Sequence, residues 1–220
     1  MAKITTLIQG KDTFEMVRDK IAAILVTESA NQVALATSSG EPDPQQWALK
    51  VYTERAAPWD NYTTGDIIVN VWFDTANVDT SASNTVQEQT MRGTFNIDVI
   101  GFARSKSNGA GHTPGDMQAA FNAARGVRFV RNILMAGQYT YLDMRPIVGQ
   151  RMPTSISSFQ PQLNTNDHVN AVGARMSLDV RYSEFSPQYE PVDIEQLSVE
   201  LQRAEDGLVY AVVEYDYTNP

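Results

Sequence analysis

The segment from Thr94 to Leu134 limits the possible folds of this chain more than any other stretch. It begins with an alternating run, TFNIDVIGFAR, continues through a loop of small residues, SKSNGAGHTPGD, and ends in an Ala-rich run, MQAAFNAARGVRFVRNIL. The first run places apolar residues on one face of a strand and polar residues on the other, at a period of two. The apolar face comprises Phe95, Ile97 and Val99, and the polar face comprises Thr94, Asn96 and Asp98. We therefore expect a half-buried strand whose polar face meets water or a neighbouring subunit.

The Ala-rich run predicts a central helix that packs closely against a sheet. Thr113 is expected as its cap, with Pro114 in the first turn and Asp116 near the positive end of the helix dipole. Small and branched apolar residues recur at helical spacing and predict a buried stripe. This stripe consists of Ala120, Ala123, Val127, Val130 and Leu134.

Arg125, Arg128 and Arg131 lie outside that stripe. Two interpretations of them stay open. Long cationic side chains form a solvated edge whose stems cover apolar surface. Alternatively, the three arginines contact acidic groups of another subunit, because the planar guanidinium suits carboxylate partners.

Hydrophobic periodicity predicts the remaining elements. A helix from Asp12 to Glu28 opens with a capping box formed by Asp12 and Glu15. The polar stretch 75–90 predicts an exposed loop, and the Pro- and Ser-rich stretch 146–166 predicts an extended connection. Strands are expected at residues 46–54, 66–74, 94–104 and 173–185, with two more in 197–217 around the turn Glu205-Asp206-Gly207.

Composition excludes several classes of protein. The chain has 220 residues and no cysteine, so disulfide frameworks, thiolate nucleophiles and Cys-based zinc sites are ruled out. No apolar run approaches the roughly 20 residues of a membrane span. The N-terminus also lacks the pattern of a signal peptide. The expected protein is soluble, is made in the cytosol and has no membrane partner.

The formal net charge of −9 argues against general nucleic-acid binding, because neutralising phosphates requires a basic surface. Two roles for the acidity stay open. It keeps the protein soluble, or it lines a channel through which DNA slides, repelled by like charge over a Debye length of about 8 Å.

The sequence contains no catalytic constellation. His112 and His168 lack the spacing of metal ligands and are interpreted as loop residues. The glycines match no phosphate-binding loop, and no nucleophile motif occurs. The carboxylate pairs Glu205-Asp206 and Asp193-Glu195 are interpreted as turn and surface groups. We therefore expect no enzyme activity, no cofactor and no metal. Tryptophans and tyrosines are expected in the core or at interfaces, with a sugar-binding platform as the alternative.

Three stretches together resemble the tail-terminator or tail-completion proteins of long-tailed bacteriophages. They are KDTFEMVRDKIAAIL near the start, DIIVNVWFD with TFNIDVIGFAR as paired strands, and DMQAAFNAARGVRFVRNIL after them. The resemblance covers about residues 10–145, and GARMSLDVRYSEF supplies the final strand. It rests on the order of the elements, because topology outlives sequence in such families.

The order of elements and this resemblance imply an α+β fold, a mostly antiparallel β-sheet packed with an N-terminal helix and a central helix, plus a C-terminal β-hairpin extension. Residues 1–145 form the terminator-like domain. Residues 146–220 supply the connection, the returning strand and the hairpin, in the same sheet or as an extension, and not as an independent domain. A minimal terminator does not need this hairpin, so its role departs from the family pattern.

The resemblance implies a structural virion protein that acts by binding. The family forms a homohexameric ring that caps the tail tube, ends tail polymerisation and joins the tail to the head-side connector. Its partners are other copies of itself, the tail tube protein and the head-tail connector protein, while DNA passes through the lumen without specific binding. The implied location is the tail or neck of the virion, after synthesis in the host cytoplasm.

A ring closed by rotation requires two different complementary patches on each subunit. The charged residues expected to serve there are Arg125, Arg128, Arg131, Asp98, Asp179 and Arg181. The polar loops 76–90 and 105–115 are expected to order on contact with the tube or the neck.

Three alternatives remain. The chain is another virion component, such as a neck, capsid-decoration or baseplate protein. It is a β-rich carbohydrate-binding module that uses exposed tryptophan and tyrosine. As an enzyme, it would depend on a carboxylate cluster that only the fold brings together.

Overall fold

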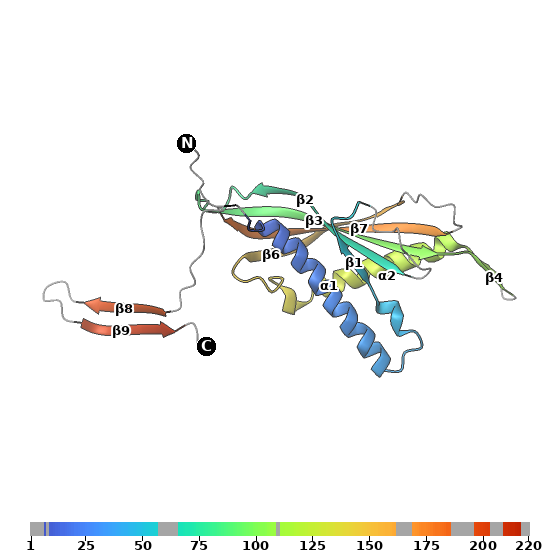
Figure 1. Ribbon diagram of the computed structural model, residues 1–220, viewed down its shortest axis with the longest axis horizontal. Helices are drawn as coiled ribbons and strands as arrows, with labels where there is room; N and C mark the ends of the chain where they lie inside the picture. Colours follow the sequence, from blue (N-terminus) through green and yellow to red (C-terminus); the bar gives the residue numbers. More distant parts are fainter. Residues whose placement is uncertain are drawn as a thin grey trace. The chain divides into compact units, whose positions relative to one another are not determined.

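The computed structural model describes residues 7, 9–56, 66–108, 111–161, 169–185, 196–202 and 209–216. The chain forms two compact units, Met1–Ser186 and Pro187–Pro220. In the first unit, two helices and a mostly antiparallel five-stranded sheet build an α+β fold, which confirms the predicted fold class (Figure 1). The second unit contains a separate two-stranded sheet.

The five-stranded sheet has the strand order β1-β2-β3-β7-β6. Its members are β1 (Lys50–Thr53), β2 (Ile67–Val78), β3 (Glu88–Ala103), β6 (Val148–Phe159) and β7 (Asn170–Phe185). β1 runs parallel to β2, and every other neighbouring pair is antiparallel. β3 and β7 pair without a register shift, from Glu88 opposite Phe185 to Ala103 opposite Asn170. This register decides which side chains share a face, because a slip of one residue turns every side chain over.

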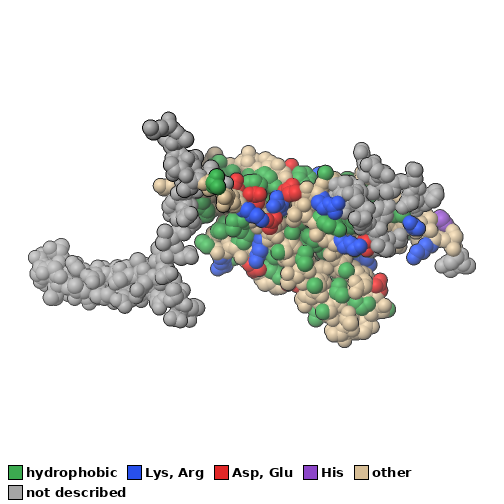
Figure 2. All heavy atoms as spheres, viewed as in Figure 1, with side chains coloured by type: hydrophobic (Ala, Val, Ile, Leu, Met, Phe, Trp, Pro, Cys, Tyr) green, Lys and Arg blue, Asp and Glu red, His purple; other side chains and the backbone are tan. Residues whose placement is uncertain are grey.

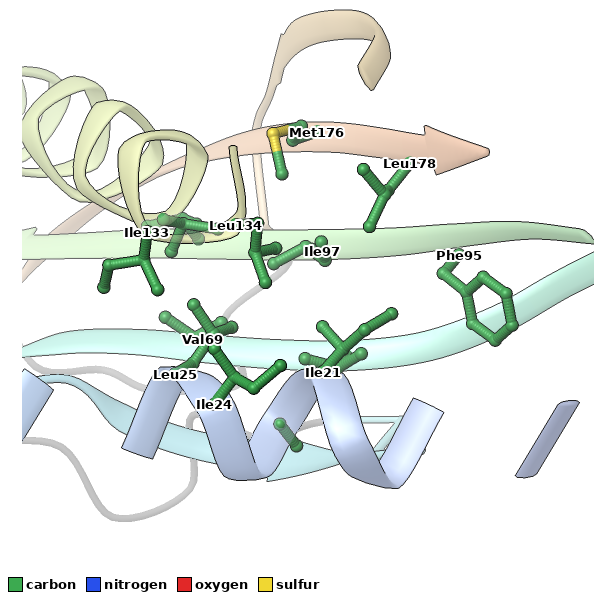
Figure 3. Close-up of a cluster of buried hydrophobic side chains, with 14 of the residues drawn as sticks. Ile21, Ile24, Leu25, Val69, Phe95, Ile97, Ile133, Leu134, Met176 and Leu178 are labelled. Carbon is green, nitrogen blue, oxygen red and sulfur yellow. The ribbon is translucent and has the colours of Figure 1, made fainter. Parts of the chain in front are cut away.

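The two long helices, α1 (Thr13–Ser38) and α2 (Gly115–Leu134), pack on one face of the sheet. Both helices and strands β2, β3 and β7 contribute to the buried cluster between them (Figure 3). The labelled members are Ile21, Ile24, Leu25, Val69, Phe95, Ile97, Ile133, Leu134, Met176 and Leu178. Burying each such side chain stabilises the fold by about 1.5–3 kcal/mol before conformational entropy is counted. The predicted apolar face of β3, with Phe95, Ile97 and Val99, is therefore a core face. The strand is not half-buried as predicted, because Asn96 and Asp98 on its polar face are buried as well.

A row of aromatic rings fixes the start of α1 over the sheet. The ring centroids of Phe14 and Phe73 lie 4.5 Å apart, those of Phe73 and Phe95 5.7 Å, and those of Phe95 and Tyr182 6.4 Å. All three pairs are tilted, a geometry that suits the ring quadrupoles. The row runs from α1 across β2 and β3 to β7, so it links four elements that are distant in sequence.

Glycine allows α2 to approach the sheet closely. A Cβ atom on Gly101 of β3 would lie 2.4 Å from the carbonyl oxygen of Ala119 and 2.5 Å from the backbone nitrogen of Ala123. On the helix side, a Cβ atom on Gly126 would lie 2.6 Å from the side chain of Val99 and 2.7 Å from that of Ile67. The contact between α2 and β3 therefore depends on missing side chains in both elements.

The start of α2 differs from the prediction. The N-cap is Pro114 instead of Thr113, and the first helical residue is Gly115. Proline has no side-chain acceptor, and the backbone N–H of Gly115 instead donates to the hydroxyl of Ser105 at 3.0 Å. A capping partner ten positions earlier in the chain leaves no local signal in the sequence.

The buried stripe of α2 also differs in part. Ala123, Val127, Val130 and Leu134 are buried as predicted, but Ala120 is only half-buried. The sheet-facing surface is instead completed by residues that the apolar pattern did not include. These are Ala119, Asn122, Gly126 and Ile133. The amide of Asn122 is buried because it donates to the carbonyl of Phe102 at 3.2 Å.

α1 begins as predicted, and its capping box includes a hydrogen bond of 3.1 Å from the N–H of Asp12 to the carboxylate of Glu15. The helix continues to Ser38, however, and does not end at Glu28. Ser29 anchors the extra turns, because its hydroxyl donates to the carbonyl of Trp47 at 2.9 Å and accepts from the N–H of Leu49 at 2.8 Å. A buried serine interrupts the apolar pattern without interrupting the helix.

Two predicted boundaries around the first strands are wrong. The predicted strand 46–54 begins later, because Pro44–Trp47 forms the 3₁₀ helix η1 and β1 starts at Lys50. The predicted loop 75–90 is shorter, because β2 and β3 extend into it from both sides and leave only 79–87 as a connection.

Two stretches predicted to lack regular structure contain strands. The predicted connection 146–166 includes β6, which pairs with β7 as the outermost strand of the sheet. The polar loop predicted at 105–115 contains a small hairpin of β4 (Lys106–Asn108) and β5 (Gly111–Thr113). The sequence did not predict β6, because an edge strand does not need apolar alternation. Register shifts near Gly149 and Thr154 also interrupt its pairing with β7.

The second unit consists of β8 (Gln196–Gln202) and β9 (Val209–Asp216), which pair antiparallel from Gln196 opposite Asp216. This pair confirms the two strands predicted at the end of the chain. The predicted turn Glu205-Asp206-Gly207, the pair Asp193-Glu195 and His168 lie outside the described residues.

Candidate interaction surfaces

The six charged residues predicted for subunit contacts fall into two groups on different sides of the sheet. Arg125, Arg128 and Arg131 lie on α2, which covers one face. Asp98, Asp179 and Arg181 alternate with the core residues of β3 and β7 and so belong to the opposite face. We call this opposite face, which carries the polar residues of β3 and β7, the polar sheet face. The structure thus brings the members of each group together and keeps the two groups apart.

A partly buried ion pair lies on the polar sheet face. The carboxylate of Asp98 accepts hydrogen bonds from Nε of Arg175 at 2.6 Å and from Nη2 at 2.9 Å. It also accepts one from Nε1 of Trp72 at 3.1 Å. The guanidinium lies 4.9 Å from the centroid of the Trp72 ring. The hydrogen bond to Asp98 raises the pKa of Arg175 despite partial burial.

Polar pairs continue along this face on β3 and β7. The hydroxyl of Ser177 donates to Oδ1 of Asn96 at 2.7 Å. One step further, the hydroxyl of Thr94 donates to Oδ1 of Asp179 at 2.9 Å. The predicted interface residues Asp98 and Asp179 therefore already have hydrogen-bond partners within the subunit.

Asp79 lies at the end of this row of paired polar side chains, beside Arg92 and Arg181. Arg92 and Arg181 are directly opposite each other on β3 and β7, a like-charge pair that destabilises a sheet when nothing compensates for it. Oδ2 of Asp79 lies 3.1 Å from Nε of Arg92 and 3.2 Å from Nε of Arg181. Hydrogen bonds from Ser81 and Arg92 lower the pKa of Asp79 to about 2. One loop carboxylate thus compensates for both arginines.

A pocket of about 350 Å³ opens beside the ion pair on the polar sheet face. Its lining residues include Asn70, Trp72, Asp98, Phe159 and Arg175. The guanidinium of Arg175 lies close to the ring of Trp72, and the indole N–H donates a hydrogen bond to the carboxylate of Asp98. The indole is therefore not a bare aromatic platform of the kind that stacks on sugars.

A second pocket, which we call the helix groove, lies between α1, η1, α2 and the 3₁₀ helix η2 (Gly137–Tyr139) and has a volume of about 480 Å³. Arg125 and Arg128 line it together with aromatic and amide side chains. Nη1 of Arg125 donates to Oε1 of Gln46 at 3.2 Å. Nε of Arg125 is buried and has no hydrogen-bond partner among the described residues. A buried donor in this state is costly.

Glu28 is the acidic residue that lines the helix groove, and both of its oxygens are engaged. The hydroxyl of Tyr139 donates to one oxygen, and the side chain of Asn31 donates to the other at 3.2 Å. The hydrogen bond to Glu28 raises the pKa of Tyr139 to about 12. No ion pair joins Arg125, Arg128 or the exposed Arg131 to a carboxylate within the described part of the chain.

The outer edge of β6 is a third exposed feature. Met152 and Ile156 are each about half exposed. The strand carries one charged side chain, Arg151, whose guanidinium turns inward and donates to the carbonyls of Leu134 and Ala136 beyond the end of α2. β6 therefore offers an edge without an outward charge, which is the kind that pairs readily with another strand.

Outside these surfaces the described residues offer little chemistry. Nδ1 of His112 lies 2.8 Å from the hydroxyl of Ser107 across the β4-β5 hairpin. Among the described residues, no three His, Cys, Asp or Glu side chains gather in a way that would hold a metal ion. No helix in that part of the chain has the length and hydropathy to cross a membrane. Basic and acidic side chains lie interspersed on the face shown in Figure 2.

The sequence patterns did not identify several residues as parts of these surfaces, namely Asp79, Arg175, Trp72, Glu28, Gln46 and Tyr139. Arg175 lies on the polar face of β7, but only the strand order reveals that it lies opposite Asp98. Gln46 and Tyr139 carried no local signal, because the residues that line the groove come from separate elements.

No protein-family model matches the chain, and no curated protein matches it either. The features that bear on function are therefore these surfaces and the order of the elements.

Proposed function

We propose that this chain is a structural subunit of a bacteriophage tail. In this proposal, copies assemble into a ring, with six subunits as the expected number, that caps the tail tube and ends its polymerisation. The ring joins the tail to the head-side connector and lets DNA pass through its lumen without specific binding. The chain acts by binding and catalyses no reaction.

One observation carries the proposal: the first unit presents two chemically different surfaces on opposite sides of a single sheet. The helix groove offers two arginines that form no ion pair within the described residues, whereas the polar groups of the polar sheet face pair with one another. A closed ring repeats one heterologous contact by rotation, so each subunit needs two unlike patches and not one self-complementary patch. The confirmed α+β fold is also the fold that the resemblance implies.

The first experiment measures mass and symmetry. We expect the full chain to give a ring by multi-angle light scattering at high protein concentration and by negative-stain imaging, either alone or after tail tubes are added. When purified tube protein polymerises in the presence of the chain, tubes should be shorter and carry a ring at one end. A chain that stays monomeric and leaves tube length unchanged would overturn the proposal.

The same assay distinguishes a tail-capping ring from other structural proteins of the virion. A capsid-decoration or baseplate protein would also be structural, but it would not limit tube length. Binding to capsids without binding to tube ends would therefore identify a decoration protein, and binding at the distal end of the tail would identify a baseplate component.

The carbohydrate-binding alternative depends on the pocket beside Trp72 and Phe159. Because Arg175 and Asp98 both engage the indole, a sugar would have to displace an existing ion pair. Binding to a glycan array that is lost in Trp72→Ala but kept in the matched variant Trp47→Ala would favour this alternative. We expect no binding above background for either variant or for the unmodified chain.

A further inference from the structure

The acidic charge of the chain is concentrated in its last residues. Residues 187–220 contain eight Asp and Glu and a single Arg. Residues 1–186 contain 18 Asp and Glu against 16 Lys and Arg, and are therefore close to neutral. The acidity noted in the whole sequence is thus not a property of the first unit.

The two arginines of the helix groove have no carboxylate partner within the described residues. Arg125 lines the groove, and Arg128 lies one helical turn further along α2 on the same groove wall. The carboxylate of Glu28 accepts hydrogen bonds from Tyr139 and Asn31 and forms no ion pair with either arginine among the described residues. A carboxylate entering the groove would pair with the guanidinium of Arg125 or Arg128.

The tyrosines next to the acidic residues of this stretch also match the lining of the helix groove. The stretch 214–217 reads Glu-Tyr-Asp-Tyr, in which carboxylates and phenol rings alternate. The groove is lined by the aromatic rings of Trp47, Phe129 and Tyr139 and by amides that both donate and accept hydrogen bonds. Such a lining favours an acidic segment that contains tyrosine over a purely charged one.

We propose that the helix groove of one copy binds the acidic stretch 187–220 of a second copy through Arg125 and Arg128. This inference rests on the proposed ring and specifies one of its contacts. The contact is heterologous, since a basic groove on one subunit meets an acidic segment of the next, and it can therefore be repeated around a ring. It also gives the C-terminal extension, which a minimal terminator lacks, a role in assembly.

Charge reversal in the full chain tests this contact from both sides. The groove variant carries Arg125→Glu and Arg128→Glu, and the tail variant carries Glu200→Lys, Glu214→Lys and Asp216→Lys. Each alone should raise the dissociation constant of self-association at least about tenfold, because like charges then face each other. The combined variant, with both sets reversed, should assemble again, and so should an equimolar mixture of the two single-set variants.

The matched control is Arg104→Glu with Lys106→Glu, which changes net charge as much as the groove variant does at two exposed positions near β4. It should assemble like the unmodified chain. Circular dichroism and thermal melting confirm that each variant is folded. The inference is overturned if the folded groove variant assembles normally, or if the combined variant and the mixture both fail to recover.

Cross-linking then tests the contact directly, because the chain has no cysteine of its own. One batch of protein carries Gln138→Cys at the groove, and another carries Ser198→Cys on β8. When the two are mixed and oxidised, we expect a disulfide-linked dimer that contains one chain of each kind and that the added groove reversal abolishes. Rings or tube ends that form without this cross-link would overturn the inference and leave the proposed function standing, whereas a chain that never assembles would remove both.

Discussion

Asp98 and Arg175 lie directly opposite each other on β3 and β7, and one edge of the guanidinium donates to both carboxylate oxygens. Asp98 is buried, while the side chain of Arg175 is 36 % exposed. The pair therefore combines the geometry of a strong ion pair with partial screening by water. Removing one partner leaves the other charge in a site from which water is largely excluded.

We expect Arg175→Ala to lower the free energy of unfolding by about 2 kcal/mol, below the range for fully buried pairs because Arg175 is partly exposed. Arg175→Lys keeps the charge but loses the planar fork and should cost about 1 kcal/mol. Urea denaturation measures both values, with Arg104→Ala as a control at an exposed arginine. Equal stability of the Ala and Lys variants would contradict the importance of the bidentate geometry.

Gly101→Ala is expected to destabilise the protein by about 3 kcal/mol or more. The added methyl group would meet backbone atoms of α2 at 2.4 and 2.5 Å, and a helix backbone cannot move aside as a flexible side chain can. Gly149→Ala is the matched control, since the nearest atom to its added Cβ is 3.9 Å away. The urea midpoints of the two variants should differ clearly; similar midpoints would show that α2 shifts without cost.

The acid stability of the protein should depend on Asp79. Its pKa in the folded chain is about 2, below the ordinary value of 3.8, so its contribution is complete above pH 4 and is lost as the pH falls toward 2. Asp79→Asn removes the carboxylate and should flatten the dependence of the melting temperature on pH between 4 and 2. The variant should also be less stable at neutral pH, because Arg92 and Arg181 then face each other without a counter-charge.

Glu41→Gln serves as the control for this titration, because Glu41 is an exposed loop residue. It should leave the acid limb of the pH profile unchanged. If Asp79→Asn follows the same acid limb as the unmodified chain, other carboxylates control acid unfolding.

Tyr139 predicts a loss of stability at high pH. Its folded-state pKa is raised to about 12 from the ordinary 10, so the hydrogen bond to Glu28 contributes fully below pH 10 and is lost as the pH rises toward 12. Tyr139→Phe should lower the melting temperature at pH 8 and make the decline between pH 10 and 12 less steep. Tyr182, whose pKa is also raised by burial, accounts for part of the remaining decline.

The matched change Tyr141→Phe removes a hydroxyl close by in the chain and should leave the steepness of this decline unaltered. A steeper decline in Tyr139→Phe than in the unmodified chain would contradict the assignment of the effect to the bond with Glu28.

The sequence was a good guide to which face of an alternating strand enters the main core. The alternation of β3 predicted that Phe95, Ile97 and Val99 lie there, but not that Asn96 and Asp98 on the other face are buried as well. It failed where burial depends on a partner distant in sequence. Ser29 and Asn122 are polar yet buried, since each bonds a backbone group of another element, and β6 is an edge strand with little apolar alternation.

The candidate surfaces were predictable only in part. The arginines of α2 and the acids of β3 and β7 stood out as charged positions off the core stripes. Their pairing did not, because it follows from the strand order, which places Arg175 against Asp98 and Arg181 against Arg92. The helix groove could be identified only from the tertiary structure, since its lining residues come from five elements, α1, η1, β2, α2 and η2.

The uncharged edge of β6 affects how readily the isolated subunit aggregates during production. Natural sheets protect such edges with lysine, proline or a covering segment, and here Pro153 and the register shifts provide the interruption within the strand. This protection is partial, because Met152 and Ile156 on either side of Pro153 are half exposed and the edge has no outward charge. In free subunits, β6 edges of different copies therefore compete with correct assembly by pairing with one another. Production at low concentration, or together with its assembly partners, should give soluble protein where strong expression alone gives inclusion bodies.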